Sequence, residues 1–321
     1  MDISASLIAA GTKYQKDLLT APLLALSRFL PFFNLRTGVQ GKVVGGTLET
    51  VGEFIPYVTA KNPTDGTTIR PREWETFLGD LLKEFDPHAV LGTLYTETTS
   101  TKPDQFEIAR KIAMRVMEKA GESLYRNLFT AVRNASGTST STLFNGFSTI
   151  VASEITATNI SVANGNYVNL TLDTDNDITE ANVGDVLRTL WEENLDEILK
   201  DREVLLYCPP KIVDLYKRWY QMEFGNVPWN AEYDQKILFC SDGQCKFVPL
   251  SCMNTQSFMY FTVRENMLIG VDQQSDTESL EIRRCDNPKL IQLWAKTYFG
   301  TGIDTLMKEL FCAVKFAYPA V

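Results

Sequence analysis

The residues in this chain that are most able to perform catalysis are few. The single histidine, His88, follows Asp86-Pro87, and no serine or cysteine forms a recognisable motif with it that would build a nucleophile and its base. A lone histidine in a loop is more often structural than catalytic. The sequence therefore predicts no catalytic residues and a protein that is not an enzyme.

Metal and phosphate sites have no complete motif either. The run Cys240-Ser-Asp-Gly-Gln-Cys245 has the wrong spacing for a zinc knuckle, and its centre is ordinary turn chemistry. Alternating carboxylates at residues 173–177 lack the glycine and the closing glutamate of a calcium loop. Gly45-Gly46 is too loose for a phosphate-binding fingerprint. No metal and no cofactor are predicted.

Composition and charge exclude further classes of protein. The chain has 321 residues, 44% hydrophobic and 22% charged, which is ordinary for a globular protein. Its 31 basic and 40 acidic residues give a formal charge of -9, which argues against a sequence-reading nucleic-acid binder but not against a container for DNA. Six cysteines in the C-terminal half stand mostly among apolar neighbours, which favours reduced core residues and folding in a cytosolic compartment.

The apolar stretch near the N-terminus does not predict export or membrane insertion. Residues 18–33 are interrupted by Pro22, Arg28 and Pro31. A spanning helix needs about 20 uninterrupted apolar residues, and a signal peptide needs a continuous apolar centre. We therefore expect no membrane partner.

Residues 44–92 carry apolar surface with no local means of burying it. Apolar residues run from Val44 to Tyr57, a turn is predicted at residues 62–66, and apolar residues return up to Leu81. A two-stranded arm of this kind is marginal alone in water, and its open edges invite another chain. In the second half, residues 74–85 fit helical spacing, whereas Gly79 favours a strand, so both alternatives stay open.

Residues 103–132 are predicted to form a long helix with one apolar stripe. About 30 residues give a rod of roughly 45 Å, which suits either a core helix or a structural spine. Loops follow at residues 134–178. The later elements expected are a helix at 179–201, a strand at 204–207, a helix from Pro210, and strands at 237–239, 246–252, 258–263, 267–270, 279–284, 289–299 and 306–316, with Gly300-Thr-Gly302 breaking the last two apart.

The order of these elements resembles the major capsid proteins of tailed bacteriophages, whose fold is shared with herpesvirus capsid floors and encapsulins. The most similar segments are Asn266-Met-Leu-Ile-Gly-Val-Asp272, Leu280-Glu-Ile-Arg283 and Leu293-Trp-Ala-Lys-Thr-Tyr-Phe-Gly-Thr-Gly302. The resemblance implies an α+β phage major-capsid fold. It assigns an N-terminal arm (1–43), an extension loop (44–92), a peripheral domain (93–140 and 286–321) with its spine helix at 103–132, and an α/β axial domain (141–285).

The resemblance also implies a function. The chain would assemble with itself, as pentamers and hexamers, into an icosahedral shell that encloses phage or prophage double-stranded DNA without sequence-specific binding. A separate scaffolding protein and a portal are the further partners that it implies. The virion capsid, assembled in the bacterial host cytoplasm, would be its location.

Four residues of the predicted arm are the candidates for contact between subunits. Phe54 and Trp74 would be apolar anchors, and Arg70 and Arg72 would offer forked hydrogen bonds to carboxylates. The alternative for each is packing within the arm or simple solvation. Lys61 near the arm's tip has no identifiable acceptor, so no covalent cross-link is predicted.

Other functions remain open from the sequence. The nearest is an encapsulin-like compartment that holds an enzyme cargo. An uncharacterised α/β enzyme would need a site that the sequence does not display. A surface-binding module would need export, and a tail or decoration role in a phage is a further alternative.

Overall fold

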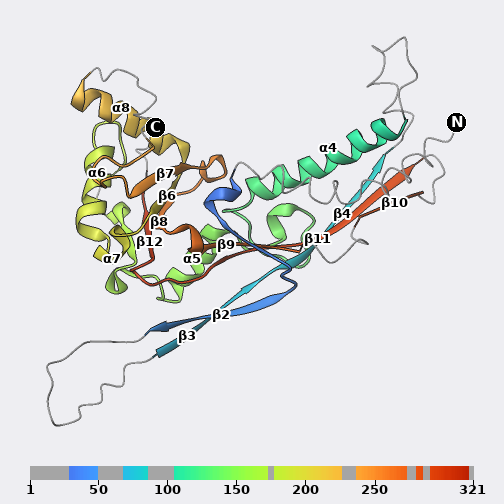
Figure 1. The fold of residues 1–321 in the computed structure, drawn as a ribbon, viewed down its shortest axis with the longest axis horizontal. Helices are drawn as coiled ribbons and strands as arrows, with labels where there is room; N and C mark the ends of the chain where they lie inside the picture. The colour runs from blue at the N-terminus through green and yellow to red at the C-terminus, as the bar shows by residue number, and fades with distance from the viewer. Residues whose placement is uncertain are drawn as a thin grey trace, which may run out of the picture.

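The computed structural model describes residues 29–49, 68–85, 105–172, 177–225, 236–272, 280–284 and 290–317. Figure 1 shows an elongated body in which helix α4 (Gln105–Arg126) lies along one sheet, while α6 (Val183–Thr189) and α8 (Pro210–Phe224) lie beside a second sheet. A hairpin of strands β2 (Lys42–Glu49) and β3 (Thr68–Glu75) extends away from the body.

The first sheet is built around one long strand, β11. Its members are β1 (Asn34–Thr37), β4 (Phe77–Phe85), β9 (Met267–Val271), β10 (Leu280–Arg284) and β11 (Ile291–Ile303). Strand β11 pairs antiparallel with β4, β9 and β10, and β1 pairs parallel with β9. Leu293, Ala295 and Phe299 are buried while the residues between them are partly exposed, as expected of a sheet with one face in the core.

The second sheet has apolar side chains on both faces. Its order is β5 (Tyr167–Asn169), β12 (Phe311–Lys315), β8 (Phe258–Thr262), β6 (Val204–Cys208) and β7 (Cys245–Pro249). Leu205 and Tyr207 of β6 face a core shared with α5 (Phe147–Thr156), whereas Val204 and Leu206 face the core that includes α6 and α8. Because all five β6 residues are buried, this strand reads as a continuous apolar run.

Short helices complete the described part of the chain. A π-turn occupies η5 (Leu190–Asn194) and α7 is Glu197–Lys200. Single 3₁₀ turns lie at η1 (Leu30–Phe32), η2 (Thr140–Thr142), η3 (Val162–Asn164), η4 (Leu170–Leu172), η7 (Ser251–Met253) and η8 (Arg264–Asn266).

The two long helices predicted from the sequence are both shorter in the structure. Helix α4 ends at Arg126 rather than 132, because the next residues turn so that Leu128 and Phe129 enter the core. The helix predicted at 179–201 is interrupted at Leu195, whose backbone is extended. There Asp196 caps a new helix by accepting a hydrogen bond from the backbone N–H of Ile198 at 3.0 Å.

Several strand boundaries also differ from expectation. The last long strand does not stop before Gly300 but continues to Ile303, because Gly300 and Gly302 remain paired with β9. The segment at 237–239 forms one isolated bridge, Ile237 with Lys246, in place of a strand. Strand β7 ends at Pro249 and β12 begins at Phe311, both short of the predicted ranges.

The prediction that residues 44–92 form one extended arm is wrong for the second half of that range. Residues 77–85 form β4, which pairs with β11 over nine positions from Phe77↔Phe299 to Phe85↔Ile291, so this half belongs to the first sheet. The strand alternative is thereby confirmed and the helix alternative is wrong. A Cβ at Gly79 would lie 3.0 Å from Leu143 Cδ2, so glycine matches a close contact here. Residues 50–67 and 86–92 lie outside the described residues.

The strand pairing crosses the expected domain boundaries, which themselves stay a prediction. Strands β9 and β10 fall within the predicted axial segment but pair with β11 in the first sheet. Strand β12 falls within the predicted peripheral segment but pairs with β8 in the second sheet. Of the predicted N-terminal arm, residues 1–28 lie outside the described residues, and β1 joins the first sheet. Which sheet a strand joins depends on partner strands that lie far away in the sequence. The local sequence pattern does not show those partners.

Candidate functional site

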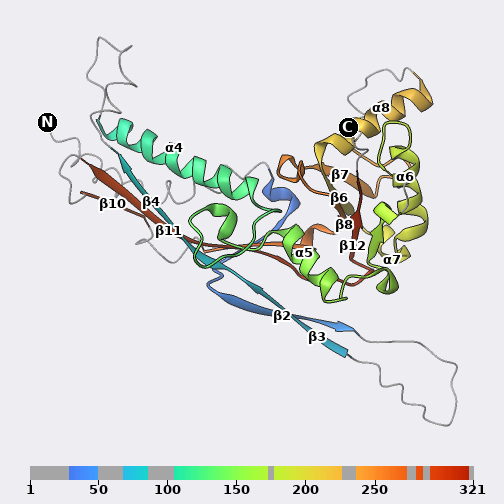
Figure 2. The same ribbon diagram turned by 180° about the vertical axis from the view of Figure 1, so that it is seen from behind.

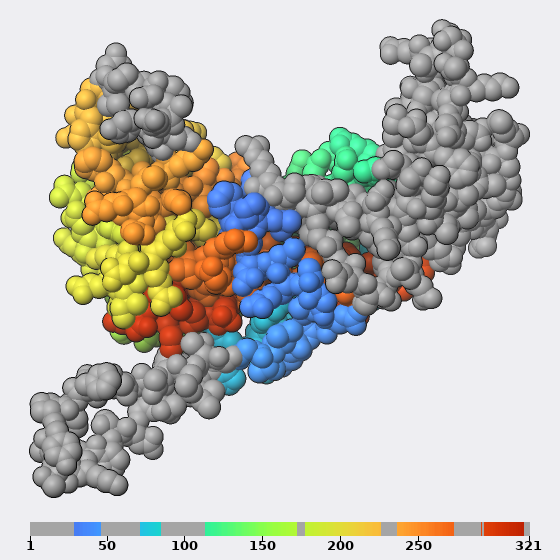
Figure 3. Space-filling model, viewed as in Figure 1, coloured from blue at the N-terminus to red at the C-terminus, as the bar shows by residue number. Residues whose placement is uncertain are grey.

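The β2–β3 hairpin is the part of the described structure that is best placed to contact another molecule. Its strands pair antiparallel from Lys42↔Glu75 to Glu49↔Thr68, and among the described strands they pair only with each other. Figure 2, seen from behind, shows the same hairpin extending beyond the body. Figure 3 shows blue and cyan atoms of the hairpin at the lower edge of the body. We call residues 42–49 and 68–75 the arm.

The base of the arm is fixed by a buried threonine. Thr76 is 3% exposed, and its hydroxyl donates to the carbonyl of Val39 at 3.0 Å while accepting from the N–H of Gly41 at 2.9 Å. Its own N–H donates to the carbonyl of Gly41 at 2.9 Å. Gly41 has φ of +83°, a conformation that L side chains rarely adopt. The chain therefore changes from arm to body at a tightly bonded pivot.

Three glycines let the arm cross the first sheet at close range. A Cβ at Gly300 would lie 2.2 Å from the carbonyl oxygen of Glu75, and one at Gly302 would lie 2.8 Å from Cβ of Trp74. At Gly270 the added atom would meet the Trp74 ring at 2.4 Å. Since carbon atoms pack at about 3.5–4.0 Å, a larger residue at any of these positions would displace the arm. Trp74 thus packs on its own subunit's sheet.

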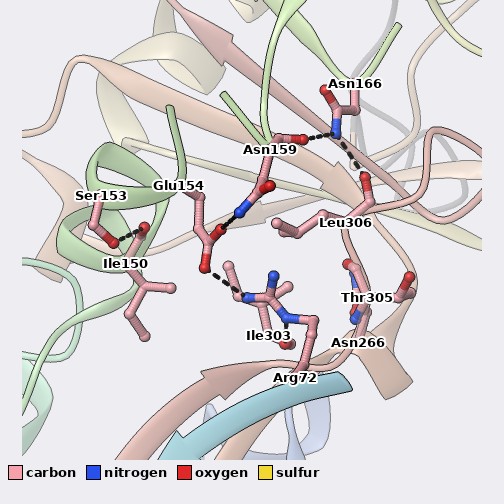
Figure 4. Close-up of polar contacts among 10 residues, drawn as sticks. All are labelled: Arg72, Ile150, Ser153, Glu154, Asn159, Asn166, Asn266, Ile303, Thr305 and Leu306. Carbon is pink, nitrogen blue, oxygen red and sulfur yellow. Dashed lines mark hydrogen bonds and ion pairs between the residues drawn. The ribbon is translucent and has the colours of Figure 1, made fainter. Parts of the chain in front are cut away.

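Farther out, Arg72 connects the arm to two separate elements of the body (Figure 4). Its Nε donates to the carbonyl of Ile303 at 3.0 Å, and its Nη2 lies 3.3 Å from Oε1 of Glu154 on α5. The two side chains are 17% and 21% exposed. Oε2 of Glu154 accepts a hydrogen bond from Asn159 Nδ2 at 2.7 Å, so the carboxylate is itself held in place.

The electrostatics of this pair differ from those of the surface pairs. Burial lowers the pKa of the Arg72 guanidinium, and the carboxylates of Glu154 and Asp304 oppose that shift. An arginine remains charged in proteins regardless. Lys42 and Glu73 form a second ion pair on the arm, with 49% and 53% of their side chains exposed. Solvent and salt screen the exposed pair much more strongly than the buried one.

The predicted contact residues are placed as follows. Arg72 and Trp74 both contact the body of the same chain, which is neither packing within the arm nor simple solvation. The side chain of Arg70 and all of Phe54 lie outside what the structure describes. A role for these four residues between subunits remains a prediction.

Sequence reasoning missed Thr76, Glu154 and the glycines beneath the arm. The glycines carried a readable signal, because glycine within a strand often marks a close backbone approach. Gly300 and Gly302 were instead interpreted as a strand break. Glu154 lies on α5, 82 positions from Arg72, and nothing local pairs the two.

The described part of the chain offers little support for a metal site, a reactive thiol or a membrane span. Within it, no group of three or more His, Cys, Asp and Glu side chains is placed to hold a metal ion. Burial raises the pKa of the thiols of Cys252 and Cys312 to about 12, so neither is a reactive thiolate near neutral pH. Of the helices that the structure describes, none has both the length and the apolarity to cross a bilayer.

No protein-family model and no curated protein sequence matches this chain. Solved structures do. A chain of the satellite phage P4 procapsid, determined with its size determination (Sid) protein, matches with a TM-score of 0.64 at 12% identity, covering 94% of this chain and 90% of that one. A chain of the empty GTA particle capsid matches at 0.56 and 13% identity, covering 89% and 95%.

The cyanophage A-1(L) capsid supplies a third match, with a TM-score of 0.54 at 10% identity, covering 93% of each chain. The matches extend over the whole fold rather than over one sheet, since each covers about nine-tenths of both chains. Because the sequence identity is this low, the matches show a shared fold and do not show a shared activity. The chain therefore has the α+β fold of phage capsid proteins.

Proposed function

We propose that this chain is a shell-forming subunit that assembles with copies of itself into a closed capsid. The observation that carries the proposal is the arm, which is anchored at its base and extends beyond the body with strands that pair only with each other in the described structure. A two-stranded ribbon is marginal alone in water, so its outer part is most stable against another surface. The similarity to capsid structures supports a neighbouring copy of this chain as that surface.

Assembly by arms has a clear physical logic. In a closed symmetric shell every subunit both extends an arm and receives one, so modest contacts act together. A single weak contact still lets a misplaced subunit leave before the shell closes. Pentamers and hexamers that form an icosahedral shell are the arrangement we propose.

A phage or prophage capsid that encloses double-stranded DNA is the finer form of the proposal. A formal charge of -9 suits a wall that does not grip the polymer, because strong binding to phosphates needs clustered lysine and arginine. A separate scaffolding protein and a portal would complete the assembly, and the virion capsid formed in the host cytoplasm would be its location. The first sheet with α4 would be the peripheral domain, and the second sheet the axial domain.

Purified full-length chain tests the coarser proposal. Size-exclusion chromatography with light scattering, followed by negative-stain microscopy, should show pentamers, hexamers, sheets or closed particles, with a co-expressed scaffold if needed. A strict monomer at high concentration, both with and without the scaffold, would contradict self-assembly.

Particles recovered from the native host test the finer proposal. They should protect double-stranded DNA from added nuclease, and the protected DNA should map to many sequences without a shared motif. Particles that hold a protein cargo in place of DNA would favour a compartment of the encapsulin kind.

A further inference from the structure

The described side chains of the arm form two ion pairs of similar chemistry but different placement. Lys42 and Glu73 form an ion pair diagonally across the hairpin, since Lys42 pairs in register with Glu75, and both side chains are about half exposed. Arg72 and Glu154 join the arm to α5, and both are mostly buried. Only the second pair connects the arm to the body, so only the second can influence the direction in which the arm leaves it.

Arg72 is suited to this task by its shape. The guanidinium presents several N–H donors in a rigid plane, and here Nε bonds the end of β11 while Nη2 bonds α5. The Ile303 carbonyl and the Glu154 carboxylate lie on different elements, so the two bonds restrain the strand in two directions. A lysine offers one ammonium on a flexible stem and holds a single point less firmly.

The backbone beside Arg72 is poorly able to resist bending by itself. Gly45 pairs with Arg72, and Gly46 pairs with Pro71 at the next position outward. Glycine weakens a strand, and proline has no N–H to give to the ladder. Arg72 is also the outermost arm residue whose side-chain bond to the body the structure describes. The restraint and the weak point of the ribbon thus coincide.

A small rotation about the base of the arm becomes a large displacement at its outer end. Strand β2 has eight residues, which at about 3.3 Å each span roughly 26 Å. A rotation of about 10° at the base therefore moves the outer end by roughly 4–5 Å, more than the tolerance of a hydrogen bond. An arm that must meet a defined surface needs its direction fixed.

We propose that Arg72 is a positioning residue, which sets the direction of the arm by bridging Glu154 and the carbonyl of Ile303. The consequence for assembly rests on the proposed function, whereas the restraint within one subunit does not. Loss of the bridge leaves the ribbon paired and the pivot at Thr76 intact, but lets the arm swing. Subunits would then assemble with mixed arm angles.

The restraint can be measured on the unassembled full-length chain. Spin labels introduced through bioorthogonal residues at Thr47 on β2 and at Val162, a residue that is 66% exposed, report the arm–body distance by pulsed electron resonance. Arg72→Gln and Glu154→Ala should each at least double the width of the distance distribution, and Arg72→Lys should broaden it less. Lys42→Gln, which breaks the exposed pair on the same hairpin, should leave the width unchanged.

Assembled material supplies the second readout. Under one assembly condition, Arg72→Gln should give a broader range of particle diameters than wild type or Lys42→Gln. If wild type forms no particles, the proposed function fails, and the distance measurement still decides the role of Arg72.

An unchanged width in Arg72→Gln and Glu154→Ala would overturn the inference. Equal broadening in Lys42→Gln would overturn it as well, because direction would then depend on the charge of the ribbon in general. If Arg72→Gln does not fold, Glu154→Ala decides, since it keeps the arginine and its bond to Ile303.

Discussion

Gly300→Ala is the change that most directly tests how the arm crosses the body. The added methyl carbon would lie 2.2 Å from the carbonyl oxygen of Glu75 and 2.9 Å from Cα of Thr76. Both neighbours are backbone atoms, so no side-chain rotation relieves the contact, and the crossing chain must move by about 1 Å to restore normal separation. That shift strains the hydrogen bonds between Thr76 and the Val39–Gly41 turn.

Three contributions set the expected change in the free energy of unfolding. Overpacking a tight contact costs about 1–3 kcal/mol, and weakening one or two hydrogen bonds adds about 1 kcal/mol. Alanine in place of glycine in a strand returns about 0.5–1 kcal/mol through backbone entropy. We therefore expect Gly300→Ala to lower the free energy of unfolding by about 1–3.5 kcal/mol.

Urea unfolding of the unassembled chain, followed by tryptophan fluorescence, measures this change. Gly45→Ala is the matched control, because its added carbon would lie 3.6 Å from Oδ1 of Asp304 and 3.8 Å from the carbonyl of Arg72, which are ordinary contacts. It should alter the free energy of unfolding by less than about 1 kcal/mol. If Gly300→Ala behaves like this control, the arm does not cross β11 at Gly300 and the account of its base is wrong.

Two further predictions concern the body. Asn266→Ala should lower the free energy of unfolding by about 2–4 kcal/mol in the same urea assay, because it leaves the N–H and carbonyl of buried Thr305 without their partners; a loss below about 1 kcal/mol would show that water replaces the side chain. Cys252 and Cys312 should resist iodoacetamide at pH 8 in the native chain, since a thiol pKa of about 12 leaves about one thiolate in ten thousand. Peptide mass spectrometry should find both alkylated only after unfolding, and rapid native labelling of either would contradict its burial.

Elements whose signal is local were predictable from the sequence. Strand β6 is a continuous apolar run followed by two prolines, and helix α8 begins at the second of them. Strands β8, β9 and β10 begin within one residue of expectation, because β8 and β9 are short, mainly apolar runs and β10 begins with alternating apolar and charged residues. The helix α4 was found as well, but its end was not, because Leu128 continues the apolar spacing while turning into the core.

What depends on partners far along the chain was not predictable. The apolar residues of β4 looked unpaired because their partner, β11, begins at Ile291, more than 200 positions away. The same distance hides the bond between Arg72 and Ile303. A lone sequence shows that apolar surface needs covering, but it does not show which segment covers it.

The arm therefore divides into two parts with opposite physical demands. Its inner part, from Thr76 to Arg72, gains stability from its own subunit through buried hydrogen bonds and the Trp74 packing. Its outer part begins where Gly46 faces Pro71, a weak point in the ladder. A ribbon that was loose throughout would lose too much entropy when it docked, and one fixed throughout could not adjust to a neighbour. If the arm docks on a neighbouring copy as proposed, the restraint of its base lowers the entropy lost on docking, because fewer arm directions have to be given up.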